Sequence, residues 1–175
     1  MFSDPKNNIM RLGLTDGMLV ADFGTGSGHY AIEASRIVGN SGRVYAIDIQ
    51  QALVKKVKNL ALAENRQNID VLWGDIEQIR GTKLGDESVD AVIIANDLFQ
   101  VEEKNNVIIE ARRILKPKGK VLVVDWLDSF AGIGPSGDVI VRESEARKLL
   151  SENGFEFVQD FDAGEHHYGL IFIKS

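Results

Sequence analysis

The sequence contains no cysteine and only three prolines in 175 residues. The lack of cysteine excludes disulfide bonds, thiolate metal ligands and thiol nucleophiles. Apolar runs are short, and none approaches the roughly 18 residues that a membrane-spanning helix needs. The first ten residues, MFSDPKNNIM, contain no apolar core of the kind found in a secretory signal. We therefore expect a cytoplasmic protein.

Positive charge is also scarce, because 20 Lys and Arg stand against 26 Asp and Glu, a net charge of −6. Such a chain offers no general electrostatic surface for a phosphate backbone, so nucleic acid is not expected as its main partner. The 44% apolar and 26% charged fractions are those of an ordinary soluble globule. We expect a single domain over 1–175, in which 1–17 form a short N-terminal flap.

Apolar strand-like runs alternate with helical patterns through the first two thirds of the chain. This alternation predicts βαβ units, a parallel sheet and right-handed crossovers. The last third differs, because a helix with Ser144 as N-cap precedes two strands joined by a short loop, which favours an antiparallel pair. We expect an α/β fold: a doubly wound, Rossmann-like three-layer sandwich with a mostly parallel seven-stranded sheet and an antiparallel C-terminal edge hairpin. The expected strands are 18–23, 43–48, 69–75, 89–96, 120–126, 155–161 and 167–173; the helices are 30–38, 52–65, 107–115 and 144–153.

Three glycines at alternate positions follow the first strand, in the stretch ADFGTGSGHYA. In open α/β sheets, ligands bind outside the carboxyl ends of the strands. Glycine there permits positive φ angles and lets a ligand approach the backbone closely. A tight turn without a ligand needs one glycine, so three of them indicate a ligand site.

The glycine spacing separates two classes of ligand. The dinucleotide fingerprint G-x-G-x-x-G would need its third glycine at His29, and Gly28 comes one residue early. The pattern acidic-x-G-x-G-x-G fits from Asp22 to Gly28, and it resembles motif I of the class I S-adenosylmethionine-dependent methyltransferases. The resemblance runs from about 17 to 174. The segments LKPKGKVLVVD and LLSENGF are similar to the small-molecule branch that includes the ubiquinone/menaquinone biosynthesis C-methyltransferases.

This resemblance implies S-adenosylmethionine as the cofactor, in-line methyl transfer to a small-molecule acceptor, and no metal. It places the ribose on Asp48, whose carboxylate can accept both hydroxyls in charge-assisted hydrogen bonds. It places the adenine amino group on Asp75 and the ring on the Ile76 backbone. The donor-binding residues that it implies are Asp22, Gly24, Thr25, Gly26, Ser27, Gly28, Asp48, Ile49, Gly74, Asp75, Ile76, Asn96 and Leu98.

Residues for the acceptor are sought near the carboxyl ends of the fourth and fifth strands and just after the glycines. The candidates are His29, Asp97, Asp125 and Trp126, and none of them is assigned as a catalytic base. His166 and His167 are adjacent and would point to opposite faces of a strand, so we expect them at the surface rather than on one metal. The sequence leaves open whether a homodimer completes the pocket.

Three other functions are kept open. Methylation of RNA, DNA or protein is one, although NDLF after the fourth strand differs from the N/D-P-P-Y motif of amino-methylating DNA enzymes. A nicotinamide-dependent dehydrogenase is disfavoured by the glycine spacing. A non-catalytic protein that binds adenosine or S-adenosylmethionine is the third, because no acid or base stands out.

Overall fold

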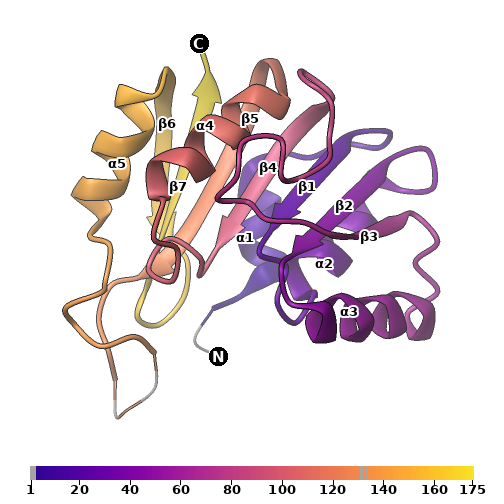
Figure 1. Ribbon diagram of the computed structural model, residues 1–175, viewed down its shortest axis with the longest axis horizontal. Coiled ribbons are helices and arrows are strands. Elements are labelled where there is room, and N and C mark those ends of the chain that lie inside the picture. Colours follow the sequence, from indigo (N-terminus) through magenta and orange to yellow (C-terminus); the bar gives the residue numbers. More distant parts are fainter. Residues whose placement is uncertain (1–2, 131, 133) are drawn as a thin grey trace.

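The computed structural model describes residues 3–130, 132 and 134–175. Seven strands form one sheet in the spatial order β3-β2-β1-β4-β5-β7-β6 (Figure 1). Pairing is parallel from β3 to β5 and antiparallel between β5, β7 and β6. This confirms the predicted sheet. The strands are β1 (Leu19–Phe23), β2 (Arg43–Asp48), β3 (Ile69–Trp73), β4 (Val89–Ala95), β5 (Leu115–Trp126), β6 (Phe155–Asp162) and β7 (His167–Lys174).

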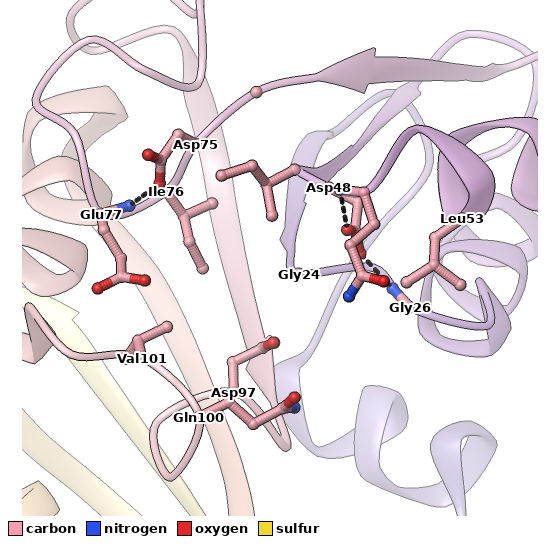
Figure 2. A pocket seen from close by; sticks show the side chains of 13 residues that line it. Gly24, Gly26, Asp48, Leu53, Asp75, Ile76, Glu77, Asp97, Gln100 and Val101 are labelled. Carbon is pink, nitrogen blue, oxygen red and sulfur yellow. Dashed lines mark hydrogen bonds between the residues drawn. The ribbon is translucent and has the colours of Figure 1, made fainter.

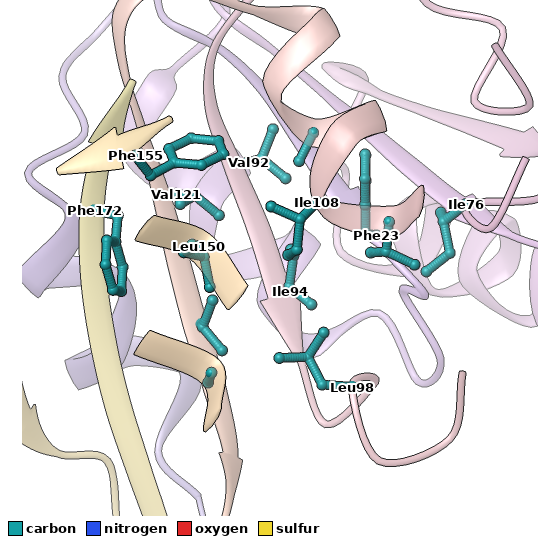
Figure 3. Packing of buried hydrophobic residues seen from close by; sticks show 14 of the residues in the cluster. Phe23, Ile76, Val92, Ile94, Leu98, Ile108, Val121, Leu150, Phe155 and Phe172 are labelled. Carbon is teal, nitrogen blue, oxygen red and sulfur yellow. The ribbon is translucent and has the colours of Figure 1, made fainter. Parts of the chain in front are cut away.

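Helices cover both faces of this sheet, because successive strand residues point to opposite sides. Phe23 belongs to a core with α4 and α5, which Figure 3 shows, whereas its near neighbour Val20 belongs to a second core with α1, α2 and α3. Two apolar cores on either side of one sheet make the predicted three layers. The helices are α1 (Pro5–Leu12), α2 (His29–Val38), α3 (Gln51–Ala63), α4 (Lys104–Ile114) and α5 (Glu143–Glu152).

The segment expected as a flap forms helix α1. The Asp4 carboxylate caps it by accepting a hydrogen bond from the Asn7 N–H at 3.1 Å. The Asn8 side chain is buried and donates to the Tyr30 hydroxyl at 2.9 Å and to the Ala163 carbonyl at 3.1 Å. With Ile9 fully buried as well, α1 is docked on α2 and the C-terminal strands.

Helix α5 begins one residue earlier than predicted, and its N-cap is Arg142 rather than Ser144. The reason is Glu145, three residues on, whose carboxylate accepts a hydrogen bond from the Arg142 N–H at 2.9 Å. Strand β5 also begins earlier than predicted, at Leu115. Its pairing with β4 skips from Leu115 to Lys120, so the intervening Pro-Gly turn is accommodated as an irregularity of the strand.

The surface position expected for His167 is wrong, because its side chain is buried. Strand β7 lies between β5 and β6 rather than at the edge of the sheet. The His167 ring packs against Trp126 with 4.2 Å between centroids. Its neighbour His166 instead pairs with the Asp128 carboxylate. In the described part of the chain, no helix combines the length and apolar character needed to span a membrane.

Candidate functional site

Two adjoining hollows lie at the carboxyl ends of the parallel strands. The first, of about 210 Å³, is lined from the ends of β1 to β4 and is shown in Figure 2. The second, of about 310 Å³, extends over the start of α2 towards α1. They share Gly24, Gly26, Asp97 and Gln100, so they form one groove with a junction at these four residues.

The three glycines of the motif have different neighbours. A Cβ added at Gly24 would lie 2.1 Å from the Asp97 Oδ1, and one added at Gly28 would lie 3.1 Å from the Val57 methyl groups. A Cβ added at Gly26 would meet nothing closer than the Gly24 carbonyl oxygen, at 3.7 Å. Gly24 therefore makes room for the protein's own carboxylate and Gly28 for α3. Gly26 alone of the three leaves open space for a ligand.

Asp48 holds the glycine bend against the end of β2. Its Oδ2 accepts a hydrogen bond from the Gly26 N–H at 3.0 Å, and its Oδ1 accepts one from the Gln50 N–H at 2.9 Å. An ionised carboxylate has about four acceptor positions. Asp48 lines the first hollow, so it can accept further hydrogen bonds from a ligand there while it fixes the loop.

Asp22 lies beneath the bend, and its side chain is 2% exposed. Its Oδ2 accepts a hydrogen bond from the Thr25 hydroxyl at 2.6 Å. Burial raises the pKa of Asp22 to about 7; the Thr25 hydrogen bond opposes this rise, and the charge of Asp48 adds to it. A carboxyl group with this pKa responds strongly to any cation placed nearby.

Asn96 and Asp97 follow β4 and carry buried polar atoms without a partner. The Asp97 Oδ2 and the Asn96 Oδ1 accept no hydrogen bond, although both atoms are shielded from solvent. Asn96 also adopts a left-handed backbone with φ 61°. Burial raises the pKa of Asp97 well above its ordinary value, and the negative charges of Asp22, Asp125 and Asp48 raise it further. Buried acceptors of this kind are rarely left unsatisfied in a folded protein, which points to a ligand with donor groups or positive charge.

The far wall of the first hollow is the loop after β3. The Asp75 Oδ1 accepts a hydrogen bond from the Glu77 N–H at 2.9 Å, which shapes the turn. Further along, Glu110 of α4 is wholly buried and anchors this loop. Its carboxylate accepts hydrogen bonds from the Thr82 hydroxyl at 2.6 Å and the Arg80 N–H at 2.9 Å, and it pairs with Arg113.

Most of the predicted donor residues line one or both hollows. Gly24, Gly26, Asp48, Ile49, Gly74, Asp75 and Ile76 line the first; Gly24, Thr25, Gly26, Ser27 and Asn96 line the second. Of the residues predicted for the acceptor, His29 lines the second hollow and Asp97 lines both.

Five predicted residues line neither hollow: Asp22, Gly28, Leu98, Asp125 and Trp126. The Leu98 side chain is fully buried in the core beneath α4 (Figure 3), so only its backbone can face a ligand. Asp125 is also buried, and its Oδ1 accepts a hydrogen bond from the Trp126 N–H at 2.8 Å. Burial raises the pKa of Asp125 to about 6, while the nearby backbone N–H groups lower it.

Sequence reasoning missed Gln50, Leu53, Glu77, Gln100 and Val101 in the lining of the first hollow, Ser3, Pro5, Tyr30 and Ala95 in the lining of the second, and Glu110 behind the first. Glu110 had a visible signal: it falls on the apolar stripe of α4 with Val107, Ala111 and Ile114, where a lone acid must find partners.

The chain matches the family model of the methyltransferase domain over residues 14–166. The ubiquinone/menaquinone biosynthesis C-methyltransferase UbiE of Hahella chejuensis is 28% identical over 159 residues, which cover 83% of this chain and 63% of that relative. This chain thus spans less than two thirds of that relative's length.

Solved structures give the same result. A SAM-dependent methyltransferase from Aquifex aeolicus superposes with a TM-score of 0.90 at 28% identity, covering 99% of this chain and 91% of that one. The [4+2]-cyclase SpnF superposes with a TM-score of 0.82 at 18% identity, covering 97% and 79%, and shares the fold. Because the family model spans most of the sequence, this chain belongs to the methyltransferase-domain family, as its motifs predict.

Proposed function

We propose that the protein binds S-adenosylmethionine in the groove and transfers its methyl group to a small-molecule acceptor. The observation that carries this proposal is the open space at Gly26, directly beside the Asp48 carboxylate. Asp97 lines both hollows and carries a buried Oδ2 without a partner, which fits a ligand with cationic groups.

The residues present fit the parts of this donor. Asp48 has acceptor positions for the ribose hydroxyls, and Gly74, Asp75 and Ile76 form the wall for the adenine. The donor's ammonium suits the acids at the bend, and the negative charge of Asp22, which is buried beneath the bend, attracts it. Its carboxylate suits the N-terminal end of α2, where the helix dipole is positive. Thr25, Ser27, Asn96 and the backbone of Leu98 complete the proposed donor site.

The donor supplies a methyl group that is already activated by a positively charged sulfur. The protein's own residues therefore need only to hold and orient the donor and the acceptor and to exclude water from them. The groove provides this, because its two hollows meet at Gly24, Gly26, Asp97 and Gln100. We propose that the second hollow holds the donor's amino-acid end at Thr25, Ser27 and Asn96 and receives the acceptor beside it, with His29 on its wall.

A small-molecule acceptor is favoured over a nucleic acid by the charge of the groove. Its walls carry Asp48, Asp75, Glu77 and Asp97, and among the described residues no Lys or Arg lines either hollow. These carboxylates would repel a phosphate backbone close to the reacting groups. The volumes also suit ligands rather than macromolecular segments.

A non-catalytic binding protein is the second candidate. The described groove holds no pair of groups placed as an acid and a base, and the cyclase SpnF shows that this fold also serves another chemistry. Donor binding alone therefore does not separate the two candidates.

The test is methyl transfer itself. The protein is incubated with methyl-labelled S-adenosylmethionine and separate pools of phenols and hydroquinones, small amines, RNA and protein. We expect label in a small-molecule pool. Label in RNA or protein alone would overturn the choice of acceptor, and binding without transfer to any pool would favour the non-catalytic candidate.

A further inference from the structure

The groove is lined by acidic side chains and not by Lys or Arg. Asp48, Asp75, Glu77 and Asp97 line it, Asp22 and Asp125 are buried behind it, and among the described residues no Lys or Arg lines either hollow, whose basic side chain is His29. A site lined by charges of one sign, with low-dielectric walls, favours ligands of the opposite charge. S-adenosylmethionine carries one more positive charge than its product S-adenosylhomocysteine, and this charge resides on the sulfur.

Asp97 occupies the junction where that charge matters. Its carboxylate lies over Gly24, where an added Cβ would come within 2.1 Å of the Oδ1. Its Oδ2 is buried without a partner. The reaction needs the donor's sulfur between the nucleoside hollow and the acceptor hollow. Asp97 lines both hollows, and Figure 2 shows it in the wall of the first.

We propose that Asp97 is a specificity-determining residue that recognises the sulfonium charge, so that the site binds S-adenosylmethionine more tightly than S-adenosylhomocysteine. This inference rests on the proposed function. The Asp97 carboxyl group, whose Oδ2 has no partner, stabilises a cation at the junction when it is ionised, but it gains nothing from the neutral thioether of the product. Loss of the charge in the reaction then weakens binding and promotes release of the product.

Donor binding is also coupled to a proton. Asp22, Asp48 and Asp125 face Asp97 from β1, β2 and β5. The burial of Asp97 and the negative charges of these three acids favour the neutral form of the Asp97 carboxyl group. A backbone hydrogen bond at Ala95 opposes this rise in the pKa of Asp97, and the charge of Lys104 lowers the pKa of its neighbour Asp125; His29 lies on the wall of the second hollow. A cation at the junction favours the ionised form, so binding of S-adenosylmethionine releases a proton from Asp97 to the buffer. Its affinity therefore rises with pH more steeply than that of S-adenosylhomocysteine.

The experiment is calorimetric titration of the full chain with S-adenosylmethionine, S-adenosylhomocysteine and sinefungin, in which an amino-bearing carbon replaces the sulfonium. We expect the wild type to bind both cationic ligands about tenfold more tightly than S-adenosylhomocysteine, a difference of ~1.4 kcal/mol. In Asp97→Asn, which keeps the side-chain shape, the ratio falls to within about twofold. Titration in two buffers of different ionisation enthalpy shows that S-adenosylmethionine releases more protons than S-adenosylhomocysteine in the wild type, and that this difference is lost in Asp97→Asn.

Asp75→Asn is the matched control, because Asp75 lines the first hollow but not the junction with the second, and it accepts its hydrogen bond within its own turn. This variant should bind all three ligands more weakly, and the ratio of their affinities should stay unchanged. Equal affinities in the wild type, or a ratio that survives in Asp97→Asn, would overturn the inference and leave the proposed function intact. Failure of all three ligands to bind the wild type would overturn the proposed function. If Asp97→Asn binds nothing, a wild-type ratio that rises with pH supports the inference and a flat ratio overturns it.

Discussion

One substitution placed at each glycine of the motif should give three different outcomes. Gly24, Gly26 and Gly28 have φ angles of 57°, 52° and 83°. Alanine in this left-handed region costs about 1–2 kcal/mol, so the three variants share this loss of stability. What differs is the space around each new methyl group.

The stability of the variants should follow that space. Gly26→Ala loses only the shared 1–2 kcal/mol or so, because its methyl has no close neighbour. Gly28→Ala loses a further 1–3 kcal/mol, roughly, because α3 must yield at Val57. Gly24→Ala is the most destabilised, because its methyl overlaps the Asp97 carboxylate. Urea denaturation measures all three.

Ligand binding should follow a different order. Gly26→Ala stays folded but binds S-adenosylhomocysteine about tenfold or more weakly, because the methyl enters the hollow. Gly28→Ala keeps close to wild-type affinity well below its melting temperature, because Gly28 lines neither hollow. Calorimetric titration of the folded variants provides the comparison.

Two results would refute this reasoning. One is a Gly26→Ala protein as unstable as Gly24→Ala, and the other is a Gly28→Ala protein that loses the ligand as completely as Gly26→Ala. The double variant Gly24→Ala/Asp97→Ala adds a control. Since removal of the carboxylate relieves the overlap, the double variant should be more stable than the sum of the two single losses implies.

Three further predictions concern the acids around the site. Asp48→Ala weakens the binding of S-adenosylhomocysteine by about tenfold to a hundredfold. It also lowers stability, because it removes the acceptor of the hydrogen bond from the Gly26 N–H. Binding at full strength would show that Asp48 is not part of the site. Asp22 binds its proton more tightly in the folded protein, so the free energy of unfolding rises by about 2 kcal/mol as pH falls from about 7 to 5. Urea denaturation at a series of pH values measures this effect. The free energy of unfolding should depend less on pH in Asp22→Asn than in the wild type, and an unchanged pH dependence would contradict the raised pKa of Asp22. Glu110→Ala loses about 3–5 kcal/mol because Arg113 is left without its buried partner, and a loss under about 1 kcal/mol in urea denaturation would contradict this role.

The parts of the fold that depend on local pattern were predictable. The alternation of strands and helices gave the parallel sheet, and the acid-glycine pattern located the bend beside Asp48. The C-terminal hairpin was also evident, but not which of its strands lies inside the sheet. Insertion of β7 between β5 and β6 is a tertiary event, and it buries His167.

Side-chain direction in turns was the other limit. Leu98 lies two residues after Asn96, which has a left-handed backbone, and its side chain is buried in the core. The structural reason for Gly24 could not be predicted either, because the Asp97 carboxylate that occupies the space beside it is far along the chain. Contacts between such distant residues are set by the packing of β1 against β4.

The most direct test of the account is a titration of the wild-type protein with S-adenosylhomocysteine and NAD⁺ side by side. We predict one molecule of S-adenosylhomocysteine per chain with a micromolar Kd, no binding of NAD⁺, and loss of binding in Gly26→Val. Binding of NAD⁺, or undiminished S-adenosylhomocysteine affinity in Gly26→Val, would contradict the assignment of this groove to the methyl donor.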